Sequence, residues 1–111
     1  MTTEQQNRVL EGIQAALNEM EGSGQNFLFL ASHRNMGVLS GSLKELAALF
    51  VFNMAAYPVF RIIIKLASDM YRKNKVEIDK LVKEDKPSHE IVNTFGYDLS
   101  KMIENLEREE K

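Results

Sequence analysis

The chain has 111 residues and a mass of 12.7 kDa, which allows one domain with a modest core and excludes a large two-domain enzyme. Its 14 Lys and Arg residues and 16 Asp and Glu residues give a formal charge of −2, without the cationic excess that strong non-specific nucleic-acid binding needs. The composition, 44% hydrophobic and 27% charged, is typical of a folded protein. We therefore expect a single domain over residues 1–111.

Two absences restrict the function and the location. The sequence has no cysteine, which excludes disulfides, thiolate metal sites, iron–sulfur clusters and cysteine nucleophiles. The first six residues, MTTEQQ, have neither the basic segment nor the apolar core of a signal peptide. Both observations favour a cytoplasmic protein.

A first helix is predicted from Thr2 or Thr3, either of which can cap it, to about Glu21. Its buried stripe is marked by four apolar residues at spacings of 3, 4 and 3, namely Leu10, Ile13, Leu17 and Met20. The segment Gly22–Gly24 should end this helix, because glycine favours turns over helix interiors.

A β-hairpin is predicted next, with strands Asn26–Ser32 and Met36–Ser40 joined by a turn at residues 33–35. Four of the six glycines lie between positions 22 and 41, where they favour turns and strand ends over a helix. A short buried helix is the alternative, and it would make the fold all-α. Both faces of the first strand are apolar, so other elements must cover each face or the hairpin must meet a second copy.

A second helix should begin at Leu43, because Ser42 and Glu45 have the spacing of a capping box. From Leu46 to Ala56 every residue except Asn53 is apolar, so this helix has no evident water-facing side. Pro58 should end it and start a third helix, since proline favours the first helical position.

The third helix is expected to continue past Tyr71 as a charged extension to Glu84, and to end at Lys86 and Pro87. Ser88 is the next candidate cap. The last helix has an apolar seam, interrupted by Gly96, at Val92, Phe95, Leu99, Met102 and Leu106. Residues 107–111 are expected to be a frayed tail.

The predicted fold is therefore α+β and predominantly α. It has an N-terminal helix, a two-stranded hairpin, a helix–Pro–helix pair and a C-terminal amphipathic helix.

The apolar segment around residues 46–56 indicates a contact between subunits. A small monomer has few elements that could surround a helix with no polar side, and exposed apolar patches mark partner sites. We therefore expect a homodimer or a larger symmetric oligomer, with another protein as a further possible partner. The predicted interface residues are Phe50, Asn53, Met54, Phe27 and Phe29. Asn53, Pro58 and Arg61 interrupt the apolar stretch and argue against a membrane span.

A possible ligand site is the turn at His33, Arg34 and Asn35, which offers an imidazole, a guanidinium and an amide side by side. Such a group could bind a small anion such as a nucleotide at an oligomer interface, with Tyr57 as an aromatic wall. Solvent-exposed turns also commonly contain these residues. His33 and His89 are too far apart in sequence to indicate a metal site, and we predict neither metal nor cofactor.

No recognisable nucleophile–base pair, carboxylate pair or phosphate loop indicates an enzyme. Residues 61–86 carry eight basic and five acidic side chains, which is a weak indication of nucleic-acid binding. The leading hypothesis is thus a small non-catalytic interaction or regulatory protein that associates with itself. An anionic-ligand module is the alternative, and a weak nucleic-acid binder is the third possibility.

Overall fold

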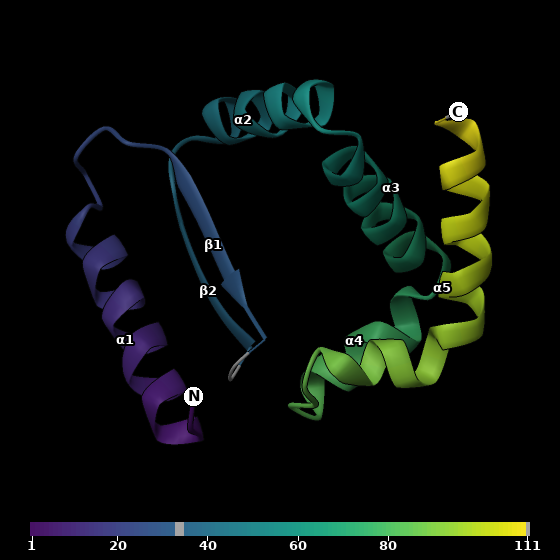
Figure 1. The fold of residues 1–111 in the computed structure, drawn as a ribbon, viewed down its shortest axis with the longest axis horizontal. Helices are drawn as coiled ribbons and strands as arrows, with labels where there is room; N and C mark the ends of the chain where they lie inside the picture. Colours follow the sequence, from purple (N-terminus) through teal and green to yellow (C-terminus); the bar gives the residue numbers. More distant parts are fainter. Residues whose placement is uncertain (33–34, 111) are drawn as a thin grey trace. The chain divides into compact units, whose positions relative to one another are not determined.

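The computed structural model describes residues 1–32 and 35–110 of the chain. In this part the elements follow in the order α1 (Thr3–Glu19), β1 (Phe27–Ala31), β2 (Met36–Ser40), α2 (Leu43–Ala56), α3 (Pro58–Lys73), α4 (Lys75–Lys83) and α5 (His89–Glu109) (Figure 1). The α+β, predominantly helical fold is confirmed, and the all-α alternative is wrong because β1 and β2 form an antiparallel pair.

The chain divides by its contacts into two compact units, Met1–Leu49 (unit 1) and Phe50–Lys111 (unit 2). Unit 1 contains α1, the hairpin and the start of α2, whereas unit 2 contains the rest of α2 and the three following helices. Each unit is described by itself below. The single domain over residues 1–111 stays a prediction, since a division by contacts does not measure whether the units fold together.

The N-terminus of α1 has the local hydrogen bonds that the sequence predicts. The Thr2 hydroxyl oxygen accepts the backbone N–H of Gln5 at 3.1 Å, and the Gln5 side-chain oxygen accepts the backbone N–H of Thr2 at 2.8 Å. This reciprocal capping box satisfies two donors that would otherwise lack a partner at the helix start. Thr2 is therefore the cap, and the helix ends at Glu19, two residues before the predicted end.

The hairpin pairs Phe29 with Val38 and Leu28 with Leu39, so successive residues of each strand alternate between two faces. α1 packs against β2 (Figure 1), where Val38 is the one buried side chain among the described residues of unit 1. Phe27 and Phe29 share the face of Val38. The other face carries leucine side chains and Gly37, and it remains largely exposed.

The helix–Pro–helix pair is confirmed. The Ser42 hydroxyl oxygen accepts the N–H of Glu45 at 3.2 Å where α2 begins. Pro58 occupies the first turn of α3, and Tyr57 before it is extended, with φ −130° and ψ 111°. Proline prevents α2 from continuing because it has no backbone N–H and its ring restricts the preceding residue.

The expectation of one continuous helix to Glu84 is wrong, because α3 ends at Lys73 and α4 begins at Lys75. Asn74 lies between them with φ −123° and ψ 33°, and its side-chain amide donates to the Met70 carbonyl oxygen at 3.4 Å. Short polar side chains bond to nearby backbone in this way and weaken helix propagation.

The last helix begins after Ser88, as predicted, although the Ser88 side chain makes no capping hydrogen bond. Phe95, directly before Gly96, leaves helical geometry with φ −114° and ψ 18°, so α5 is kinked where the sequence predicts a break. The helix continues to Glu109, through most of the segment expected to fray. The buried residues described in unit 2 are Met70, Ile78 and Leu106, one from each of α3, α4 and α5.

Candidate interaction surface

Helix α2 is the least covered apolar element of the described chain. None of its residues is buried, although all but Lys44, Glu45 and Asn53 are apolar. Leu43, Val51 and Phe52 are the most exposed of its large side chains. A helix of this composition is stable in water only when its apolar sides contact something, so α2 is the first candidate for a contact between molecules.

All three predicted interface residues on α2 have partners inside unit 2. Phe50 is half-buried and packs edge-to-face against Phe60, with ring centroids 5.7 Å apart. The backbone carbonyl of Met54 accepts a hydrogen bond from Arg61. Asn53 is half-buried, and its carbonyl oxygen accepts the N–H of Tyr57 at 2.9 Å. The sequence argument missed Val51 and Phe52 because an all-apolar helix gives no periodic signal for its outer side.

The predicted hairpin residues divide between the two faces of the sheet. Phe27 and Phe29 are half-buried on the face of Val38. The opposite face is more exposed, with Leu30 at 70% and Leu39 at 59% of their full accessible areas. The alternation of side chains predicts two faces but does not say which of them α1 covers. The interface assignment of Phe27 and Phe29 stays a prediction.

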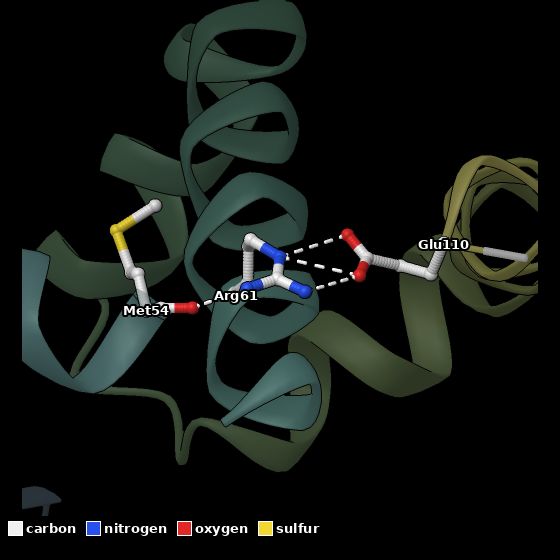
Figure 2. A network of polar contacts seen from close by, with 3 residues as sticks. All are labelled: Met54, Arg61 and Glu110. Carbon is white, nitrogen blue, oxygen red and sulfur yellow. Dashed lines mark hydrogen bonds and ion pairs between the residues drawn. The ribbon is translucent and has the colours of Figure 1, made fainter. Parts of the chain in front are cut away.

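Arg61 joins three helices of unit 2 (Figure 2). Its Nε donates to both carboxylate oxygens of Glu110, at 2.9 and 3.2 Å, and its Nη2 donates to one of them. Its Nη1 donates to the carbonyl oxygen of Met54 near the end of α2. A planar guanidinium can hold a carboxylate and a carbonyl at the same time, so Arg61 ties α3 to the end of α2 and to the end of α5.

This contact changes the pKa of both partners. The hydrogen bonds from Arg61 hold the pKa of the Glu110 carboxyl below its usual value, in spite of desolvation that raises it. The same hydrogen bonds raise the pKa of Arg61. Both side chains are partly shielded from water, with relative exposures of 29% and 21%, which limits screening of the pair by solvent.

Glu110→Gln is expected to destabilise unit 2 at pH 7, because an amide cannot supply the charged acceptors that Arg61 contacts. The folded-state pKa of Glu110 lies below its ordinary value of 4.5, so this stabilisation is complete above that pH and is lost as the pH falls through the folded-state pKa. The melting temperatures of wild type and variant, measured from pH 7 to 3, should therefore converge in acid. Glu109→Gln, at the exposed neighbour, is the control. Equal effects of both variants at pH 7 would contradict the assignment.

The basic segment after Tyr71 is largely paired with acids. Lys75 contacts Asp79 at 2.8 Å, and the Tyr71 hydroxyl donates to the same carboxylate at 3.0 Å. These hydrogen bonds raise the pKa of Lys75 and lower that of Asp79. The other pairs of this region are Arg72–Asp69, Lys73–Asp98 and Lys80–Glu84. Paired charges have less to offer a phosphate backbone, so the arrangement gives no added support to nucleic-acid binding, which stays a prediction.

The predicted ligand turn lies mainly outside the described residues, which include neither His33 nor Arg34. Asn35 is exposed in left-handed geometry, with φ 50°, and its N–H donates to the Ser32 carbonyl oxygen at 3.1 Å. Tyr57 is exposed and belongs to the other unit. A shallow hollow of about 440 Å³ lies between α1 and the end of β1, where the described lining residues are Met1, Gln6, Val9, Leu10, Ala31 and Ser32. These side chains are uncharged, and the anionic-ligand hypothesis stays a prediction.

The described residues contain neither a cluster of metal ligands nor a helix that could span a membrane. No three His, Cys, Asp or Glu side chains among them are grouped so that they could hold a metal ion. Within the same residues, every helix is too short or too polar to cross a membrane.

No protein-family model, no curated protein and no solved structure matches the chain.

Proposed function

We propose that this protein is a small non-catalytic interaction protein that works as a homo-oligomer, with α2 in the contact between subunits. The observation that carries the proposal is the exposure of α2, whose apolar side chains include Val51 and Phe52 and whose residues are all unburied. Burial of apolar area is the main driving force of association, at about 25 cal/mol per Å² removed from water. A second copy of the chain can bury these apolar side chains without any other partner.

The polar groups support binding rather than catalysis. The described groups with shifted pKa values are Arg61, Lys75, Asp79 and Glu110. Each has an ion-pair partner that accounts for its shift, and these two pairs hold helices or helix turns in place. A catalytic centre instead needs several polar groups that converge on a space for substrate.

Sedimentation equilibrium of the wild-type protein at micromolar concentration tests the proposal, with Val51→Glu as the disrupting variant. A carboxylate introduced into an apolar interface loses its water without gaining a partner, so we expect the dissociation constant to rise at least about tenfold. Val76→Glu is the matched control, because Val76 on α4 is 78% exposed and Val51 is 64% exposed. The control should associate like the wild type.

A wild-type protein that stays monomeric at about 100 μM would overturn the proposal, because interfaces of standard size give affinities from micromolar to picomolar. If Val51→Glu and Val76→Glu weakened the association of subunits equally, α2 would not be part of the interface. Circular dichroism of both variants establishes that the helices remain, so that loss of association is not loss of folding.

A further inference from the structure

The hairpin is too small to be a complete sheet. β1 and β2 have five residues each, and they are the only strands among the described residues. A two-stranded hairpin is marginal in water unless further strands or a helix pack against it. Here α1 packs against β2, but the leucine face of the hairpin stays largely exposed. Along its outer edge, alternate backbone N–H and C=O groups of β1 face away from β2 and can pair with another strand.

The β1 edge is also unprotected. Natural edge strands commonly carry lysine, proline or a bulge that prevents pairing with another chain. β1 has the sequence FLFLA, with no charge and no proline, and it pairs with β2 residue by residue without a bulge. α1 packs against β2, which leaves β1 as the strand farther from that helix (Figure 1).

We propose that β1 pairs along this edge with β1 of a second copy, so that two hairpins form one four-stranded antiparallel sheet. A two-fold axis perpendicular to the sheet keeps each side chain on its own face. An odd-numbered residue can therefore lie only opposite an odd-numbered residue of the second copy, and an even-numbered residue only opposite an even-numbered one. The register that pairs all five residues is centred on Phe29. It places Phe27 opposite Ala31 of the second copy, and Leu28 opposite Leu30.

A second copy of this chain is the occupant that the observations favour. In the centred register the strand is complementary to itself, since phenylalanine and alanine side chains meet on one face, leucine side chains meet on the other, and no like charges meet. The paired sheet also joins the exposed leucine faces of the two hairpins into one apolar surface. This inference rests on the proposed homo-oligomer and adds to it a contact in unit 1, whereas Val51 and Phe52 belong to unit 2.

Single cysteines test the pairing directly, because the natural sequence has none. Phe29→Cys places two thiols opposite each other across the axis. A mixture of Leu28→Cys and Leu30→Cys proteins does the same for the neighbouring pair, with two exposed side chains whose replacement should leave the fold intact. Pairs along an antiparallel ladder alternate between wide and narrow spacing, so one of the two designs falls at the narrow spacing that a disulfide can bridge.

We expect one of these designs to form a covalent dimer after mild oxidation with diamide, severalfold more completely than the control Leu39→Cys. Leu39 lies on β2 and is 59% exposed, whereas Phe29 is half-buried and Leu28 is only 37% exposed. Random collisions would therefore favour the control over both the Phe29–Phe29 pair and the Leu28–Leu30 pair. Preferential cross-linking of Leu39→Cys would overturn the edge pairing in favour of stacked leucine faces. If neither design forms a covalent dimer although the protein sediments as an oligomer, the edge pairing is overturned and the proposed homo-oligomer stands. A monomeric wild type would overturn the proposed function as well.

Discussion

Ile78→Ala is expected to lower the free energy of unfolding of unit 2 by about 2–5 kcal/mol. Ile78 is only 8% exposed, and it is the buried residue of α4. Its truncation removes apolar contacts and leaves a cavity that the surrounding helices can fill only in part. Proteins of this size are stable by only about 5–15 kcal/mol, so the loss is a large fraction of the total.

Val76→Ala is the matched control, because Val76 lies two residues away on the same nine-residue helix and is largely exposed. Both substitutions replace a β-branched residue with alanine and improve helix propensity alike. Val76→Ala should therefore change the stability by less than about 0.5 kcal/mol. Urea denaturation followed by circular dichroism measures both variants. A similar, small change in the two would mean that Ile78 is not a core residue.

The secondary structure was largely predictable because its signals are local. Capping at Thr2, the start of α3 at Pro58 and the hairpin between glycines each depend on residues within a few positions of one another. The break at Asn74 escaped prediction, since the charged sequence around it supports a helix and only the local bond of Asn74 to Met70 ends it.

The contacts between distant residues could not be predicted in the same way. Arg61 and Glu110 are 49 positions apart, and the charged end of the chain has no periodicity that indicates a fixed partner. The packing of two phenylalanines on α2 was equally unpredictable from the sequence pattern. Phe50 packs on Phe60, whereas the neighbouring Phe52 is exposed. Composition identified α2 as a candidate surface, but only tertiary structure distinguishes its covered side from its exposed side.

Gly41→Ala is expected to destabilise unit 1 by about 1–3 kcal/mol, which is the range for a residue forced into disfavoured backbone geometry. Gly41 lies between β2 and α2 with φ +130°, a conformation that glycine adopts and alanine rarely does. A Cβ atom at this position would also collide with the side-chain oxygen of Asn26. The substitution therefore strains the connection between the hairpin and α2 in two independent ways.

The two causes can be separated by adding Asn26→Ala, which removes the collision and leaves the backbone strain. We expect the double variant to be more stable than Gly41→Ala but less stable than Asn26→Ala alone, as measured by urea denaturation. Gly12→Ala is the control, because Gly12 lies inside α1 with open space around its Cβ position, and alanine there should stabilise the helix by about 0.5–1 kcal/mol. If Gly41→Ala were as well tolerated as Gly12→Ala, the chain would not pass from β2 into α2 in left-handed geometry.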